Sequence, residues 1–240
     1  MSLKKYYHWI YISKNDVKTF NSAFTKTPNL YCNDEKAGVK CSAKTEIDDI
    51  KNHDHCYAWT IKDTNIKLIH ETNYGPYLIK VKWQKLDFNE EFKDFLIQLV
   101  FEAHELAQQI KDEGLYGEVQ EGAVTATISS LVAKWSYSAD YLTILDLTSE
   151  LLFAFACRHK FKNGNKRTAL IVGVLFLKFC GLFFMHTNVT EKDYMEYWEE
   201  LMVSIVETFT IEKEKENKLL KRISKTIDKF ITLSYTRYID

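Results

Sequence analysis

A basic turn followed at once by an apolar run constrains this chain more than any other stretch. The turn lies within residues 158–170, RHKFKNGNKRTAL, where basic side chains and one histidine surround Asn-Gly-Asn. The apolar run, residues 169–179, is interrupted only by Gly173 and Lys178. It is long enough for a helix but too short and too interrupted to span a bilayer. The stretch therefore predicts a buried helix that begins at a glycine-asparagine turn.

The N-terminus of such a helix suits an anion. Its first backbone N–H groups have no partner within the helix, and the aligned peptide dipoles give it a partial positive charge. Lys166 and Arg167 add charge, and arginine can bind phosphate through two parallel hydrogen bonds. His159 supplies a side chain that readily exchanges a proton near neutral pH. The pattern favours phosphoryl or nucleotidyl chemistry, and a plain solvated turn is the alternative that composition leaves open.

The loop 159–170 is also similar to a known signature. The residues that carry this resemblance are His159, Phe161, Asn163, Gly164, Asn165, Lys166, Arg167, Thr168, Ala169 and Leu170. They resemble the signature loop of the Fic/Doc family, and most closely that of the Doc (death-on-curing) branch, which typically reads H-x-F-x-D-[AG]-N-K-R-T-A-L. Only Asn163 departs from the typed positions. The resemblance extends over about residues 88–209.

The resemblance and the hydrophobic pattern together predict a mainly α fold. A Fic/Doc-type helical domain, residues 87–240, would follow a small mixed α/β domain of unassigned role, residues 1–86. Apolar residues at helical spacing predict helices within 92–110, 125–135, 144–155, 165–180, 194–209 and 212–228. Aromatic, β-branched and alternating residues predict strands within 6–12, 56–61, 66–71 and 77–83.

The resemblance implies roles for the loop residues. His159 would be the general base that takes the proton of an incoming protein hydroxyl, which requires hydrogen-bond reach. Lys166 and Arg167 would be catalytic by neutralising charge during transfer, a reaction dominated by positioning and electrostatics. Phe161 would be the structural anchor that holds the loop on the core.

A phosphate-binding set and a metal are implied as well. The implied nucleotide-binding residues are Asn163, Gly164, Asn165, Lys166, Arg167 and Thr168, and the implied ligands are ATP or another nucleoside triphosphate with Mg²⁺. Both branches usually carry an acidic residue at the position of Asn163, where its carboxylate holds Mg²⁺. Asparagine offers only a neutral oxygen, whereas magnesium sites generally use carboxylates. Metal binding is therefore expected to be weaker, supplied elsewhere or absent.

Two positions favour the Doc branch. Enzymes of the Fic branch that transfer AMP usually have glycine at the position of Lys166 and a second arginine at that of Leu170. The resemblance thus implies a Doc-like toxin that transfers a phosphoryl group to a Ser, Thr or Tyr hydroxyl of a target protein, such as a translation factor. The alternatives are Fic-type AMP or other nucleotidyl transfer and a catalytically silent regulatory or binding protein, which Asn163 supports.

The implied partners are the target protein and an antitoxin. The family's inhibitory pattern, S/T-x-x-x-E-G/N, is not found; Thr208-x-x-x-Glu212 comes near it, but Lys213 follows. A net charge of −1 over 240 residues argues against wholesale binding of nucleic acid or anionic membrane. Five cysteines, two of them in apolar helical runs, suggest reduced thiols in a cytoplasm, and the resemblance to Doc implies that it is bacterial.

The N-terminal cysteines and histidines match no paired zinc spacing, so ordinary loop and strand residues are expected at Cys32, Cys41, His53, His55 and Cys56. His104 is expected to be a surface or core-edge residue and not a ligand, because no second ligand stands at helical spacing. The resemblance implies a flap, an edge on which the target backbone lies, and places it at residues 136–140.

Overall fold

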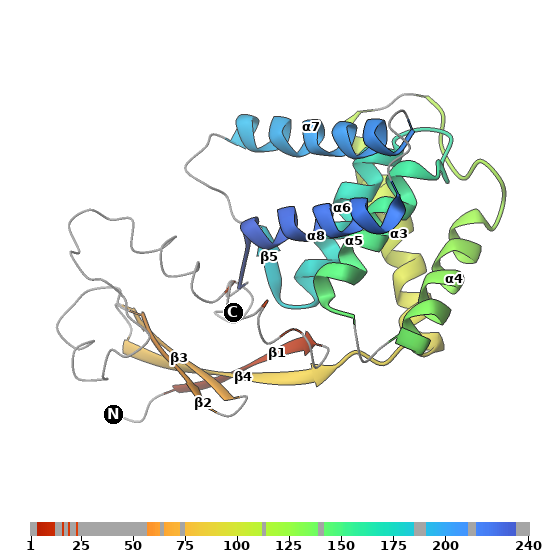
Figure 1. The fold of residues 1–240 in the computed structure, drawn as a ribbon. Helices are drawn as coiled ribbons and strands as arrows, with labels where there is room; N and C mark the ends of the chain where they lie inside the picture. The colour runs from red at the N-terminus through yellow and green to blue at the C-terminus, as the bar shows by residue number, and fades with distance from the viewer. Residues whose placement is uncertain are drawn as a thin grey trace.

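The computed structural model describes residues 4–12, 16, 19, 23, 57–62, 65–72, 75–111, 114–138, 142–184, 191–210 and 215–233. Within these residues a four-stranded sheet is followed by a helical region (Figure 1). The cysteine and histidine cluster considered for zinc lies outside the described residues. The change from strands to helices falls between Lys85 and Glu90.

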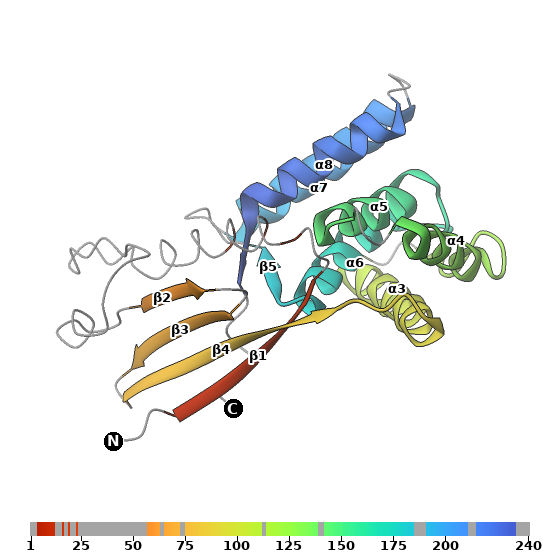
Figure 2. The same ribbon diagram turned by 60° about the horizontal axis from the view of Figure 1, so that its bottom comes forward.

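The N-terminal sheet is mixed. Its strands are β1 (Lys4–Ile12), β2 (Tyr57–Lys62), β3 (Asn65–Thr72) and β4 (Gly75–Lys85). Their order is β1-β4-β3-β2, with β2, β3 and β4 joined as antiparallel neighbours. Strand β1 pairs in parallel with β4, so the chain enters the sheet at one edge and returns beside it (Figure 2). The structure has strands at all four predicted places; β1, β3 and β4 are longer than predicted, and β2 has the predicted length but lies one residue further along the chain.

The rest of the described chain is almost entirely helical. Its helices are α3 (Glu90–Ile110), α4 (Ala123–Ser138), α5 (Ile144–Cys157), α6 (Asn165–Phe179), α7 (Glu191–Thr210) and α8 (Glu216–Phe230). Two short strands that the sequence did not predict, β5 (Leu182–Phe184) and β6 (Ile231–Leu233), pair in an antiparallel manner. Within the described residues, no helix combines the length and the apolarity needed to cross a membrane.

Helices α5 and α6 form the centre of the helical region. Almost every residue of α5 is buried, and the helix packs against α6, α7 and α8. A Cβ on Gly173 of α6 would come within 2.9 Å of Leu152 Cδ2 of α5, so a larger residue at position 173 would force Leu152 to shift. Among the residues whose burial the structure describes, the largest fully buried side chains are Trp135, Trp198, Phe153, Phe155, Phe161 and Phe176. Burial of each large apolar side chain contributes about 1.5–3 kcal/mol.

At two of these helices, side chains accept hydrogen bonds from the backbone N–H groups of the first turn. At α5, Thr143 accepts a hydrogen bond from the Asp146 backbone N–H while the Asp146 carboxylate accepts one from the Thr143 N–H, which is a capping box. The Asp16 carboxylate also accepts from the Ile144 N–H at 2.8 Å. At α3, Asn89 accepts from the Phe92 N–H. Helix α6, which follows the signature loop, begins differently.

Candidate functional site

Helix α6 starts at a glycine with no side chain to cap it. Gly164 occupies the N-cap position in the left-handed conformation, with φ 71° and ψ 11°. Its carbonyl accepts the first helical hydrogen bond, from the Thr168 N–H at 2.8 Å. No side chain among the described residues caps this terminus, and the first turn carries Lys166 and Arg167 instead of acidic residues. The terminus therefore combines uncapped N–H donors with two cationic side chains.

Asn165 braces the loop from within. Its Oδ1 accepts a hydrogen bond from the Phe161 N–H at 2.9 Å, and its Nδ2 donates to the Phe161 carbonyl at 2.7 Å. Both ends of the amide are thus used on one backbone residue, and the Asn165 side chain is itself almost fully buried. The two bonds close the loop 161–165 into a fixed shape, so any contact of Asn165 with a phosphate would be made by its backbone.

A second segment holds the other side of the loop. The Val119 N–H donates to the Lys160 carbonyl and the Lys162 N–H donates to the Gly117 carbonyl, both at 3.0 Å. These bonds form an antiparallel bridge between Glu118 and Phe161. The flap was expected at residues 136–140, but residues 136–138 are the last turn of α4, and residues 139 and 140 lie outside the described part. The edge observed against the signature loop is 117–119.

His104 of α3 lies directly behind the loop. Its ring stacks on Phe161, with 3.8 Å between centroids, and on Tyr116 from the other side at 4.9 Å. The ring is fully buried, so the expectation of a surface or core-edge position is wrong. Its place follows from helical spacing, because Val100, Ala103 and Ala107 on the same face are buried too.

The hydrogen bonds of His104 indicate one neutral tautomer. The Gly117 N–H donates to Nε2 at 3.4 Å, so Nδ1 carries the proton and donates to Thr168 Oγ1 at 3.1 Å. Burial lowers the pKa of His104, and the nearby Arg167 charge lowers it further, against a smaller opposing effect of Glu105. The neutral ring therefore ties α3, the 117–119 edge and α6 together.

Arg167 spans the space between two helix ends. Its Nη1 donates to the carbonyls of Ala107 at 2.9 Å and Lys111 at 2.8 Å, at the C-terminus of α3. Cationic side chains at a helix C-terminus complement its partial negative charge. The same guanidinium lies close to the N-terminal turn of α6, with Nη2 3.7 Å from the position of a Cβ on Gly164. Arg167 is thus held in position before any anion binds.

Gln108 fills the space beside Gly164. A Cβ on Gly164 would lie 3.0 Å from Gln108 Nε2. That amide nitrogen is buried and has no hydrogen-bond partner in the described part of the chain. The left-handed φ and this contact both favour glycine at position 164.

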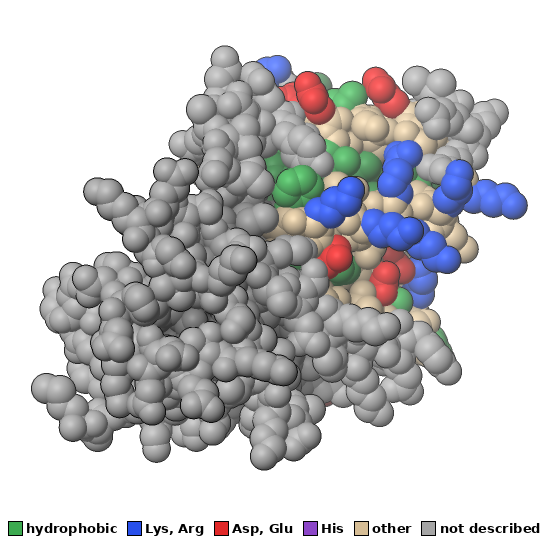
Figure 3. Space-filling view, turned by 60° about the vertical axis from the view of Figure 1, so that its left-hand side comes forward, with side chains coloured by type: hydrophobic (Ala, Val, Ile, Leu, Met, Phe, Trp, Pro, Cys, Tyr) green, Lys and Arg blue, Asp and Glu red, His purple; other side chains and the backbone are tan. Residues whose placement is uncertain are grey.

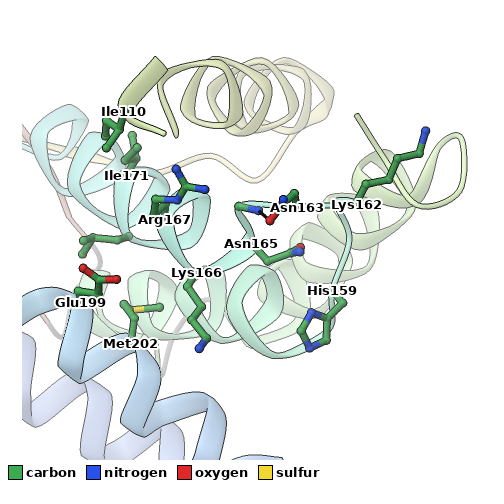
Figure 4. A pocket seen from close by; sticks show the side chains of 12 residues that line it. Ile110, His159, Lys162, Asn163, Asn165, Lys166, Arg167, Ile171, Glu199 and Met202 are labelled. Atoms are coloured by element: carbon green, nitrogen blue, oxygen red, sulfur yellow. Dashed lines mark hydrogen bonds between the residues drawn. The ribbon is translucent and has the colours of Figure 1, made fainter. Parts of the chain in front are cut away.

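These elements surround a pocket of about 410 Å³ (Figure 4). The described residues that line it are Ile110, His159, Lys162, Asn163, Gly164, Asn165, Lys166, Arg167, Leu170, Ile171, Glu199 and Met202. In Figure 4, His159 and Glu199 lie toward opposite ends, with Lys166 between them. Figure 3 shows lysine and arginine side chains gathered on one face of the described surface. The volume is in the range of small-molecule and cofactor sites.

The pocket brings together most of the residues expected from the sequence. His159, Asn163, Gly164, Asn165, Lys166 and Arg167 all line it. Phe161 and Thr168 are fully buried behind the loop, where Phe161 packs on the core and Thr168 accepts from His104. His159 is exposed and has a φ of 44°, an uncommon value for a residue other than glycine.

Sequence reasoning missed the contribution of other helices. Ile110 comes from the end of α3, and Glu199 and Met202 come from α7. The spacing of apolar residues in α7 predicts a helix with one buried face and does not indicate a pocket. Glu199 sits directly beside the buried Trp198, at the edge of that face, and no motif marks it as part of a site. Only tertiary packing brings it to the loop.

Asn163 engages its neighbour instead of facing a metal. Its Oδ1 accepts a hydrogen bond from the Gly164 N–H at 2.8 Å. The Asn163 oxygen expected to bind a metal and the Gly164 N–H expected to bind phosphate are thus hydrogen-bonded to each other. Within the described residues, no three histidine, cysteine, aspartate or glutamate side chains cluster as a metal site would require. This donor set, one neutral and engaged oxygen, does not fit a carboxylate-held Mg²⁺ ion.

Comparison with known families agrees with this architecture. Residues 94–177 match the model of the Fic/DOC family. The match runs from α3 through α6, includes the signature loop and covers less than half of the chain. It confirms the predicted fold, mainly helical with a Fic/Doc-type core. No curated protein matches the chain.

Proposed function

We propose that this protein transfers the terminal phosphoryl group of a nucleoside triphosphate to a hydroxyl of a target protein. One observation carries the proposal: the open N-terminus of α6, with Lys166 and Arg167, shares a pocket with the exposed His159. The helix N-terminus and the two cationic side chains suit a triphosphate, and His159 supplies a base that lines the same pocket. The Fic/DOC match of residues 94–177 supports transfer to a protein target in general.

The proposed step balances without a covalent enzyme intermediate. The target hydroxyl oxygen attacks the γ-phosphorus, and His159 accepts the hydroxyl proton. The bond between the γ-phosphorus and the β–γ bridging oxygen breaks, and the nucleoside diphosphate leaves. Lys166 and the backbone donors of α6 offset the charge on the transferring group, as positioning and electrostatics dominate such reactions.

The nature of two pocket residues favours phosphoryl over nucleotidyl transfer. Lys166 stands where the AMP-transferring branch usually has glycine, and Leu170 where that branch usually has a second arginine. Both side chains line the pocket, so each difference changes the surface that a nucleotide would meet. The Leu170 side chain gives an apolar wall instead of a second guanidinium.

A radiolabel experiment tests the proposal. Purified protein is incubated with Mg²⁺, a bacterial lysate and ATP or GTP labelled at either the γ- or the α-phosphate. Label transferred to protein from the γ-position alone, and lost in His159→Ala, is the expected result. Label from the α-position would instead establish nucleotidyl transfer. Lys160→Ala is the matched control, because Lys160 adjoins His159 but does not line the pocket.

The second candidate is a catalytically silent binding protein, and the Asn163 contact favours it. The bond from the Gly164 N–H to Asn163 Oδ1 occupies one donor of the turn and the only oxygen of the asparagine side chain. An aspartate could hold the Gly164 N–H with one oxygen and leave the other for a metal ion. If wild-type protein transfers no label while Asn163→Asp does, the silent protein is the better description.

A further inference from the structure

The pocket has two chemically different ends. Around the start of α6 it is lined by His159, Lys162, Lys166 and Arg167 together with the turn backbone. Further along α6 its walls are apolar: they are formed by Ile110, Leu170, Ile171 and Met202. A phosphate chain matches the first end, and the second suits a flat, weakly polar group such as a nucleobase.

One carboxylate stands at the apolar end. Glu199 is the single acidic residue among the described residues that line the pocket, and Figure 4 shows it beside Met202, across from Ile171. It forms no hydrogen bond or ion pair with any other described residue. Its oxygens are therefore not engaged by the described part of the chain and can accept hydrogen bonds from a ligand. An ionised carboxylate accepts and cannot donate, so it selects for groups that present N–H donors.

Among the common bases, guanine presents the N–H donors that match this carboxylate best. Its Watson–Crick edge presents the N1–H and the N2 amino group side by side, so one carboxylate can accept from both. Adenine presents its N6 amino group next to the N1 acceptor, which would face a negative oxygen without a hydrogen bond. Cytosine has the same donor-beside-acceptor pattern, and uracil has one N–H between two carbonyl oxygens. Hydrogen bonds to a charged acceptor are also the stronger ones.

We propose that Glu199 is a specificity-determining residue that accepts hydrogen bonds from the guanine edge, so that the preferred nucleotide is GTP. The inference rests on the proposed function, because it places the triphosphate at the start of α6. The base then lies along Leu170 and Ile171 toward α7. In this arrangement the nucleotide bridges two helices, with its charge at one end and its base at the other.

Titration calorimetry on the full chain, with no target protein present, tests this assignment. The probes are the β,γ-imido triphosphates of guanosine, inosine and adenosine, together with inorganic triphosphate. Inosine differs from guanosine only by lacking the 2-amino group. The variants are Glu199→Gln and, as matched control, Glu200→Gln, since Glu200 is the exposed next residue of the same helix and does not line the pocket.

The wild type should bind the guanosine compound about tenfold or more tightly than the inosine compound, and the adenosine compound more weakly still. Glu199→Gln should bring these ratios to within about threefold, and Glu200→Gln should leave them unchanged. Ratios cancel the general gain in anion affinity that follows removal of a negative charge. Equal binding of the three nucleotides by the wild type, or unchanged ratios in Glu199→Gln, would overturn the assignment.

Inorganic triphosphate separates this inference from the proposed function. If it binds wild type and Glu199→Gln while the nucleotides show no base preference, triphosphate binding at the start of α6 is supported and the guanine assignment is wrong. If neither triphosphate nor any nucleotide binds, the phosphate end itself is wrong and both proposals fall. A guanosine preference that depends on Glu199 supports both.

Discussion

Helices α5 and α6 pack against each other at the centre of the same core, yet their N-termini are built in opposite ways. Helix α5 has a capping box from Thr143 and Asp146, and the Asp16 carboxylate binds its first N–H. Helix α6 has a glycine cap, and its first turn carries Lys166 and Arg167. An acidic first turn stabilises a helix and a basic one does not.

The difference separates stability from ligand binding. Every feature of the α5 terminus lowers the free energy of the folded chain without any ligand. The α6 terminus leaves N–H donors uncapped, and its two cationic side chains lie at the positive end of the helix dipole, which destabilises the helix. These features become favourable only when an anion binds there. Variants at the α5 terminus should therefore change the free energy of unfolding, and variants at the α6 terminus should change ligand binding or phosphoryl transfer.

The largest effect is expected from His159→Ala beside the α6 terminus. Loss of a positioned general base should reduce label transfer by about 10²–10⁴-fold. Because the side chain is exposed, the free energy of unfolding should change by no more than about 0.5 kcal/mol. Single-turnover labelling and urea unfolding measure the two quantities. Activity within twofold of the wild type would show that His159 is not the base.

Asn165→Ala should affect the α6 N-terminus by destabilising the loop that precedes it. It leaves the N–H and carbonyl of the buried Phe161 without their partners, at a cost of about 2–4 kcal/mol in the free energy of unfolding. Triphosphate affinity should fall as well, because the loop loses its fixed shape. Urea denaturation and calorimetry report the two effects, and Asn89→Ala, which removes the α3 cap, is the control. A loss no larger than that of Asn89→Ala would contradict the bracing role.

Thr143→Ala is the counterpart at the α5 terminus. Removal of this N-cap should lower the free energy of unfolding by about 1 kcal/mol. Affinity for inorganic triphosphate, measured by calorimetry, should stay the same because Thr143 does not line the pocket. A change in affinity comparable to that of a pocket variant would show that the two termini are coupled.

The smallest expected effect is a pH dependence of stability from His104. Burial and Arg167 lower its pKa below the ordinary value of 6.5. Above that value the ring is neutral in both states and its contribution is fully present. As the pH falls through 6.5 toward the lowered pKa, the unfolded chain takes up a proton that the folded chain does not, so stability falls. Urea midpoints at about pH 7.5 and 5.5 should differ more for wild type than for His104→Asn; an identical difference would remove His104 as the cause.

The sequence predicted the elements better than their tertiary contacts. Apolar spacing located all six described helices of the C-terminal part, because each must bury one face. The uncapped start of α6 was also foreseen, since glycine and asparagine before an apolar run leave few other choices. The strand pair β5–β6 was missed because three-residue strands carry no usable periodicity.

Only the pocket residues that lie close together in the sequence were predicted. The residues of the loop 159–170 follow one another along the chain, so their proximity needs no knowledge of packing. Glu199 and Met202 reach the pocket only because α7 packs beside α6, and the pairing of 117–119 with the loop depends on where the turn after α3 folds back. The expected position of His104 was wrong because its helical spacing with the buried Val100, Ala103 and Ala107 was not used.

The contact between Gln108 and Gly164 also has a consequence for how such chains diverge. The amide nitrogen of Gln108 lies 3.0 Å from the position of a Cβ on residue 164, so a methyl group there would require the Gln108 side chain to move. A related chain that carries alanine at position 164 should have a shorter side chain at position 108. In an alignment of relatives the two columns should covary, although 56 residues separate them in sequence.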